Sequence, residues 1–119
     1  MRKTSHALLA LVALMVAALA LAGCSSTSGS QGGPTTVQVS IHGDTITPNG
    51  DRIKVGVGQP VTLKIGSDRD GELHVHSTPE QHLEYSKGST TRKITIDKPG
   101  IVDVEDHKAD VVVVSLEVS

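Results

Sequence analysis

Beyond residue 36 the chain alternates apolar and polar residues in short runs. In the first run, Val37, Val39 and Ile41 are separated by single polar residues. Because successive side chains of a strand point to opposite faces, this period of two predicts half-buried β-strands. Turn-forming residues separate the runs, and no segment after residue 36 keeps the period of about 3.6 residues that indicates a helix. The runs cover residues 37–41, 53–57, 61–65, 73–76, 83–85, 94–96, 102–104 and 111–118.

About seven to nine short strands separated by turns predict an all-β fold, specifically an antiparallel Greek-key β-sandwich. Its core would consist of valine, isoleucine and leucine, which suit a pleated surface. We expect residues 83–85 to form a short edge strand. The consecutive valines at 111–114 favour an interior strand, because nothing within them would protect an exposed edge. The residues expected on one face of that last strand are Val112, Val114, Leu116 and Val118.

The N-terminus follows a different pattern, in which Arg2 and Lys3 precede an uninterrupted apolar run at residues 7–22. A basic start, an apolar stretch and small residues before a cleavage site are typical of a secretory signal peptide. A transmembrane helix is the alternative interpretation. However, the run is shorter than the roughly 20 apolar residues that such a helix needs, and no basic stop-transfer segment follows it.

The sequence Leu-Ala-Gly-Cys at residues 21–24 resembles the lipobox of bacterial lipoproteins. This resemblance implies that residues 1–23 are removed as a signal peptide and that Cys24 carries a diacylglycerol. We therefore expect a lipid-anchored protein on the extracytoplasmic side of the cell membrane, because two or more acyl chains suffice for stable attachment. The sequence leaves open whether the inner or the outer membrane holds it.

The composition limits the remaining possibilities. Residues 24–36 are rich in glycine and serine and predict a flexible tether, which leaves one domain at residues 37–119. The formal net charge is −2 and Tyr85 is the only aromatic residue, so we expect no nucleic-acid partner. Cys24 is the only cysteine, which excludes a disulfide and a thiolate ligand within the domain.

Several segments of this domain resemble the cupredoxin family, which implies a cupredoxin-like sandwich over residues 37–119. An immunoglobulin-type sandwich is the alternative, but the chain lacks the cysteine pair and the tryptophan of that class, and Val102 stands where its corner tyrosine is expected. The resembling segments are the strand–glycine–strand entry at 55–63, the histidine segment at 73–76, the strand and turn at 87–100, the loop at 105–110 and the closing strand at 111–118.

The resemblance also implies a metal-ligand loop at residues 105–110, where cupredoxins have cysteine, histidine and often methionine. Here Asp106 or a neighbour stands in place of the cysteine, and the two methionines, Met1 and Met15, belong to the predicted signal peptide. A blue-copper centre needs a thiolate, two imidazoles and usually an axial methionine. We therefore expect that the protein is not a blue-copper electron carrier.

The histidines offer a different kind of metal site. His74 and His76 are two residues apart in a predicted strand, so they share a face with Glu72 and lie roughly 6.5–7 Å from one another. That distance allows two imidazoles to bind one ion. His82 follows shortly afterwards, but its strand assignment rests on a weaker pattern.

If the sandwich closes as in cupredoxins, the loop with His107 lies at the same end of the fold as His74 and His76. These three imidazoles, completed by the carboxylates of Glu72 and Asp106, would form a nitrogen and oxygen ligand set. Such a set suits Cu(II) or Zn(II), whereas Cu(I) prefers sulfur. The next candidate ligands are Glu80, His82 and Glu84.

The histidines also allow a metal-free interpretation. Histidines on the solvent face of a strand are ordinary, and they could instead form a polar surface with which a metal-free sandwich docks on an envelope protein. His42, next to a glycine turn, is interpreted as a plain surface residue. The loop at 68–71 lacks the distal glutamate of a calcium loop, and no nucleophile-elbow motif surrounds a serine, so we do not expect an enzyme.

Overall fold

The structure, a computed structural model, describes residues 33–119. The predicted signal peptide at residues 1–23, the lipidation residue Cys24 and most of the predicted tether lie outside the described residues. Within residues 33–119 there is no helix, as expected, and therefore none of the length and apolarity needed to cross a bilayer.

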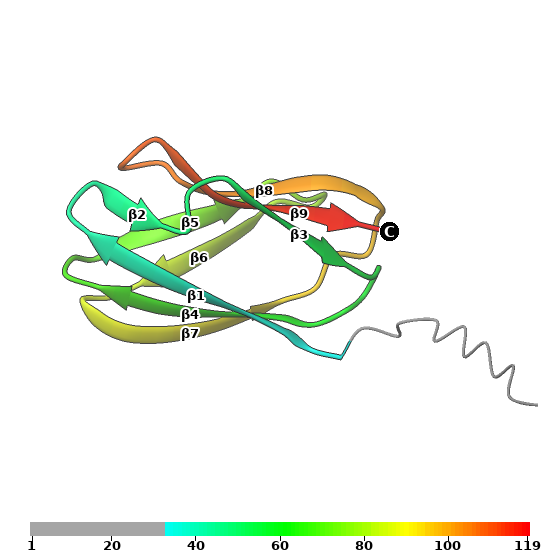
Figure 1. The fold of residues 1–119 in the computed structure, drawn as a ribbon, viewed down its shortest axis with the longest axis horizontal. Helices are drawn as coiled ribbons and strands as arrows, with labels where there is room; N and C mark the ends of the chain where they lie inside the picture. The colour runs from blue at the N-terminus through cyan, green and yellow to red at the C-terminus, as the bar shows by residue number, and fades with distance from the viewer. Residues whose placement is uncertain (1–32) are drawn as a thin grey trace, which may run out of the picture. The chain divides into compact units, whose positions relative to one another are not determined.

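Nine strands form two sheets that pack face to face as a β-sandwich (Figure 1). One sheet has the strand order β2-β1-β4-β7 and the other has the order β3-β9-β8-β5-β6. The predicted all-β sandwich is therefore confirmed. The strands are β1 (Thr35–His42), β2 (Thr45–Thr47), β3 (Asp51–Val55), β4 (Val61–Ser67), β5 (Gly71–Val75), β6 (Gln81–Tyr85), β7 (Gly88–Ile94), β8 (Gly100–Asp106) and β9 (Val111–Val118).

Strand pairing is mixed, which corrects the expectation of a wholly antiparallel sandwich. β1 pairs with β4 in parallel, and β3 pairs with β9 in parallel, whereas the other neighbours are antiparallel. After β1 the chain forms β2, crosses to the other sheet as β3, and returns as β4. A connection of that length can bring the chain back to the same end, which a short hairpin cannot do.

Two positional expectations hold. The strand predicted at residues 83–85 is β6, which lies at the edge of the five-stranded sheet, and the valine-rich strand β9 lies in its interior between β3 and β8. The face predicted for β9 is wrong at Val112. A β-bulge shifts the register, so that Val104 pairs with Val114 but Glu105 pairs with Val112. The extra residue, Val113, is buried together with Val114.

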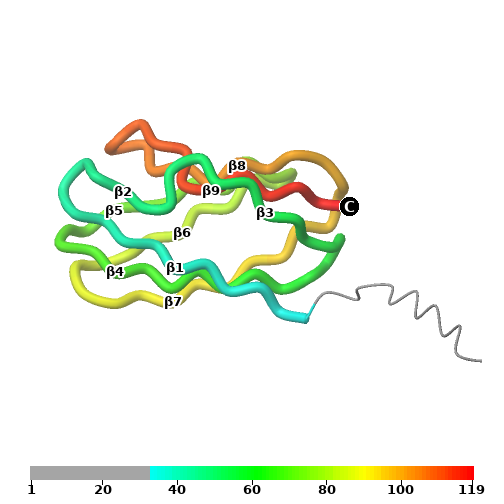
Figure 2. The backbone as a smooth tube through the Cα atoms, in the orientation of Figure 1, coloured from blue at the N-terminus to red at the C-terminus, as the bar shows by residue number. Residues whose placement is uncertain are grey.

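The core lies between the two sheets, and all nine strands contribute at least one buried apolar side chain to it. Valine and isoleucine dominate, and the one aromatic ring, Tyr85, is buried as well. Because all nine strands of residues 33–119 share one core, we treat the fragment 31–119 as an independently folding domain. Figure 2 shows that the β1–β2 turn and the β8–β9 connection lie at the same end of the sandwich.

Candidate metal centre

Strand β5 presents a polar row on the solvent face of the five-stranded sheet. Leu73 and Val75 are fully buried, so Glu72 and His74 project from the opposite face, and His76 directly follows the strand. This confirms that the spacing places the histidines and Glu72 on one side of the chain. The adjacent strand β6 adds His82, which pairs in register with His74.

Four imidazole rings gather on this face. The ring of His107, from the β8–β9 connection, stacks on that of His74 with 3.9 Å between centroids, and the ring of His82 meets His74 edge-on at 4.3 Å. His76 lies 5.7 Å from His107, again ring centroid to ring centroid. The sequence brought His74, His76 and His107 together as candidates, and the structure places all three here. We call these four histidines, with Glu72, Glu80 and Glu105, the histidine cluster.

The first group of possible metal ligands within this cluster comprises Glu72, His74 and His82. Glu72 Oε1 lies 2.5 Å from His74 Nε2 and 3.1 Å from His82 Nδ1. These hydrogen bonds lower the pKa of Glu72, that from His82 most, although desolvation opposes the shift. The potential ligand atoms of the three residues lie within 4.8 Å of one another, close enough to surround one ion.

The second group comprises His76, Glu105 and His107. Glu105 Oε2 lies 2.9 Å from His76 Nε2 and 3.7 Å from His107 Nε2. Again the potential ligand atoms lie within 4.8 Å of one another. Each group therefore supplies two imidazole nitrogens and one carboxylate, a set that suits Cu(II) or Zn(II) and that leaves coordination positions open.

The sequence predicted one site around His74, His76 and His107, but the geometry divides these residues between two groups. The division follows the carboxylate that each imidazole faces, because His74 faces Glu72 whereas His107 faces Glu105. Neither group of ligand atoms within 4.8 Å of one another contains both His74 and His107.

Asp106 does not join the histidines, which corrects its place in the predicted ligand set. Its side chain is fully buried, and its carboxylate accepts hydrogen bonds from Tyr85 Oη at 2.5 Å, from Arg69 Nη2 at 3.1 Å and from the amide of Ala109 at 2.9 Å. Arg69 also donates to Tyr85 Oη and to the carbonyl of Gly43. We call Arg69, Tyr85 and Asp106 the buried triad.

The buried triad is fully satisfied, because no buried side-chain nitrogen or oxygen in residues 33–119 lacks a hydrogen-bond partner. Burial favours the neutral form of Asp106, but the hydrogen bonds from Tyr85, Ala109 and Arg69, with the charge of Arg69, outweigh it and lower the pKa of Asp106. Burial and the neighbouring carboxylate raise the pKa of Tyr85 far above its ordinary value. Asp106 is thus an anion held by fixed donors.

Glu105 and Glu80 enter the cluster on different grounds. The sequence analysis did not select Glu105 as a ligand. Val102 and Val104 point inward, so a period of two places Asp106 inside as well and Glu105 on the outer face. Glu80 was a secondary candidate, and its Oε1 lies 3.2 Å from His74 Nδ1. The side chain of Glu84 makes no ion pair with a histidine in the described part of the chain.

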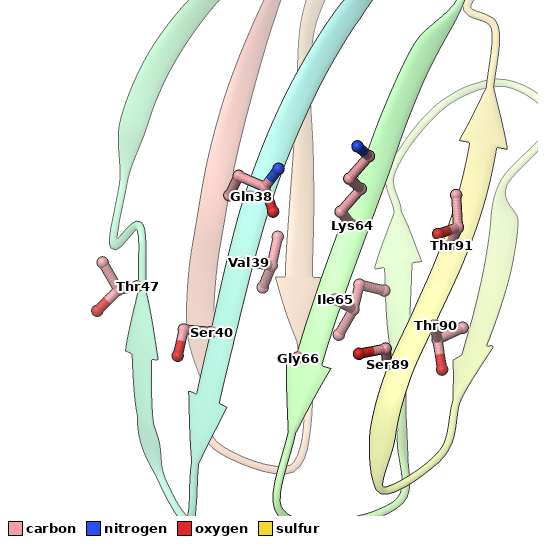
Figure 3. Close-up of a pocket in the computed structure, with 10 residues that line it drawn as sticks. All are labelled: Gln38, Val39, Ser40, Thr47, Lys64, Ile65, Gly66, Ser89, Thr90 and Thr91. Atoms are coloured by element: carbon pink, nitrogen blue, oxygen red, sulfur yellow. The ribbon is translucent and has the colours of Figure 1, made fainter.

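A separate groove of about 500 Å³ lies on the four-stranded sheet, away from the histidine cluster. Figure 3 shows side chains from neighbouring strands lining it, among them Gln38, Ser40, Lys64, Ser89 and Thr91. No histidine or carboxylate lines this groove. It therefore offers hydroxyl and amide hydrogen bonds rather than metal ligands.

No family model matches this chain, and no curated protein matches it either. Among solved structures, a Cu(I) variant of amicyanin is similar with a TM-score of 0.52 at 14% identity, over 71% of this chain and 82% of that one. A purple cupredoxin from Nitrosopumilus maritimus is similar with a TM-score of 0.51 at 12% identity, over 71% of this chain and 99% of that one. The fold is cupredoxin-like. At these sequence identities the similarity supports the fold alone. The cupredoxin-like domain contains no cysteine, which a blue-copper site requires as a ligand.

Proposed function

We propose that this protein is a membrane-anchored envelope lipoprotein whose cupredoxin-like domain binds a divalent transition metal, Cu(II) or Zn(II), through the histidine cluster. One observation carries the metal-binding part. Four imidazoles and three carboxylates converge on one solvent-accessible face. All of them except Glu80 belong to two groups, and within each group the ligand atoms lie within 4.8 Å of one another. Imidazole and carboxylate ligands suit these ions.

The proposed role is to hold, buffer or deliver the ion rather than to transfer electrons or to catalyse a reaction. The domain has no thiolate for a blue-copper centre. The ligand candidates are partly exposed, with 40% of the His76 side chain and 51% of the His107 side chain accessible. Ligands at the surface allow an ion to enter and leave without unfolding, which supports an exchange role.

The membrane anchor rests on the lipobox-like sequence at residues 21–24 and the apolar run before it. Replacing Cys24 with serine removes the proposed acylation site. We expect the protein expressed in a bacterial envelope to carry the mass of a diacylglycerol at Cys24, and the Cys24→Ser protein to lack it, because one thioether carries the lipid. An N-terminus of equal lipid content in both proteins would contradict the lipid anchor.

Metal binding is tested by thermal unfolding of residues 31–119 with Cu(II), with Zn(II) or without metal. An ion at 100 times its Kd should stabilise the native state by about 2.7 kcal/mol, because it binds the folded and not the unfolded chain. This gain should vanish in the His74→Ala/His76→Ala double variant and after addition of a chelator. The matched control is His42→Ala, whose histidine is 74% exposed and lies outside both groups.

A second candidate function is a metal-free interaction module that docks on an envelope protein. The groove on the four-stranded sheet favours it, because its serine, threonine and glutamine side chains offer hydrogen bonds to a polypeptide. The unfolding experiment separates the two functions. A domain that neither metal stabilises, with or without the histidines, contradicts metal binding and directs attention to this groove.

A further inference from the structure

The two ligand groups of the histidine cluster share no residue and use different atoms. In the first group, His74 Nε2 and His82 Nδ1 face Glu72 Oε1. In the second, His76 Nε2 and His107 Nε2 face Glu105 Oε2. Each group has its own carboxylate, so neither needs the other to complete a ligand set of two imidazoles and one carboxylate.

Glu80 stands between these groups and faces the nitrogens that the groups leave free. Its Oε1 lies 3.2 Å from His74 Nδ1 and 3.8 Å from His76 Nδ1. A histidine that binds a metal through one nitrogen characteristically donates the N–H of the other to a carboxylate, which fixes the ring orientation and makes the ligand more basic. Glu80 is within hydrogen-bond distance of His74 Nδ1, and it lies within ion-pair distance of His76 Nδ1, which a small side-chain movement would convert into the same contact.

Building on the proposed function, we propose that the histidine cluster binds two divalent ions, one in each group, and that Glu80 is a shared positioning residue coupling the two sites. His74 belongs to the first site and His76 to the second, so one carboxylate orients a ligand of each ion. Fixing the ring of His74 for the first ion also fixes the Glu80 side chain beside His76, which prepares the second site.

Charge supports double occupancy. Two divalent cations repel one another when they bind neighbouring sites, and this repulsion opposes loading of the second ion. Glu72 and Glu105 each supply one negative charge within a group, and Glu80 adds a third between the groups. A carboxylate shared by both sites therefore offsets part of the repulsion that a pair of isolated sites would have to bear.

The experiment measures Zn(II) stoichiometry and affinity for residues 31–119 by native mass spectrometry and isothermal titration calorimetry. We expect two ions per chain. The Glu72→Gln/His82→Ala variant should lose one of them, and the Glu105→Gln/His107→Ala variant should lose the other. Each variant retains one complete ligand group, and its substitutions lie on the solvent face of the sheet.

The role of Glu80 is tested with Glu80→Gln, which keeps the size of the side chain but removes its charge. Loss of such a carboxylate should weaken both binding steps by about 10- to 100-fold, leave the stoichiometry at two and shift the absorption of bound Co(II). The metal-free unfolding temperature should not change. Glu84→Gln is the matched control, because Glu84 lies on the same face, in register with Glu72, without an ion pair to a histidine.

Three different results would contradict metal binding, the presence of two sites and the role of Glu80, respectively. No binding of Zn(II), Co(II) or Cu(II) to the unsubstituted domain would overturn the proposed function itself. One ion per chain, lost equally in both group variants, would leave metal binding intact and overturn the two-site inference. Two ions with equal affinities in Glu80→Gln and Glu84→Gln would overturn the coupling through Glu80.

Discussion

Glu105 and Asp106 are neighbours in the sequence and carry the same functional group, yet they lie in opposite environments. Asp106 points into the core, where Arg69, Tyr85 and a backbone amide donate to its carboxylate. Glu105 points to solvent, where its carboxylate lies among the imidazoles of His76 and His107. The alternation of strand β8 produces this difference, because it sends consecutive side chains to opposite faces.

The comparison shows that the partners of a carboxylate decide what it can do. Those of Asp106 are fixed donors in the interior, and one of them, Arg69, carries the opposite charge, so removing Arg69 leaves the buried charge of Asp106 without compensation. Those of Glu105 are imidazoles at the surface, which can exchange a proton for a metal ion. The buried triad therefore stabilises the domain, whereas the histidine cluster is the part of the molecule that can bind and release a ligand.

Truncating Asp106 and Glu105 separately should change the stability of the domain by very different amounts. Asp106→Ala should lower the free energy of unfolding by about 3–5 kcal/mol, because it leaves the charge of Arg69 largely buried and unpaired. Glu105→Ala should change it by less than about 0.5 kcal/mol, as is usual for surface positions. Chemical denaturation of the metal-free domain measures both.

The same two variants should show the reverse order in metal titrations. Glu105→Ala removes the carboxylate of one ligand group and should lose one binding step, while any folded Asp106→Ala protein should retain both groups. If Asp106→Ala proved as stable as Glu105→Ala, the assignment of the buried triad as a structural element would be wrong.

A smaller effect is expected at Gly71, which pairs with Tyr85 across strands β5 and β6. A β-carbon at this position would lie 2.6 Å from Tyr85 Cζ and 2.8 Å from Arg69 Nη1, so Gly71→Ala must displace the buried triad. Overpacking of this kind typically costs about 1–3 kcal/mol. Gly66→Ala is the control, because its nearest new contact, the carbonyl oxygen of Val39 at 3.9 Å, is an ordinary one.

Equal stabilities of the Gly71→Ala and Gly66→Ala domains in chemical denaturation would show that the triad adapts freely. A selective loss in Gly71→Ala, with metal binding unchanged, would instead confirm that the strand pairing needs a residue without a side chain beneath the tyrosine ring. Like the two substitutions at Glu105 and Asp106, this result would show that the buried triad affects stability without affecting metal binding.

The pH dependence of stability should show a smaller difference between the buried triad and the histidine cluster. The pKa of Asp106 is lower in the folded protein than in the unfolded chain, so its contribution is complete above the unfolded value of about 3.9 and is lost as the pH falls through the lower folded value. The metal-dependent gain should weaken at higher pH than this, because metal ligands must be deprotonated.

Unfolding temperatures of the metal-free and Zn(II)-loaded domain, recorded from pH 7.5 to pH 3, measure both effects. The two curves should converge while the metal-free domain is still folded. A metal-free curve that already declines steeply near neutral pH would contradict the assignment of its acid limb to Asp106.

Much of the fold could be predicted because alternation is a local property. Burial at every second position gave the strands, and the run of valines at 111–114 indicated an interior strand correctly. Partner choice is not local, so the parallel pairs β1–β4 and β3–β9 were not foreseen. The bulge at Val113 was equally hidden, because the residues around it are all valine and give no sign of where an extra one is inserted.

In the candidate site, too, the local features could be predicted and the features that depend on tertiary packing could not. Spacing alone placed Glu72, His74 and His76 together on one face. The error at Asp106 arose because its position was taken from the family's ligand loop rather than from the alternation of Val102 and Val104. The separation into two groups could not be predicted, since it depends on which carboxylate each imidazole faces, and only three-dimensional packing determines this.

The place of His82 on the edge strand has one more consequence. β6 has a single neighbour, β5, so local opening of this strand breaks only one ladder of hydrogen bonds and should be among the least costly motions of the sheet. An ion held between His82 and His74 would cross-link the two strands. Loading the first site would then slow amide hydrogen exchange along Gln81–Tyr85, so that this margin of the sheet would report whether the ion is bound.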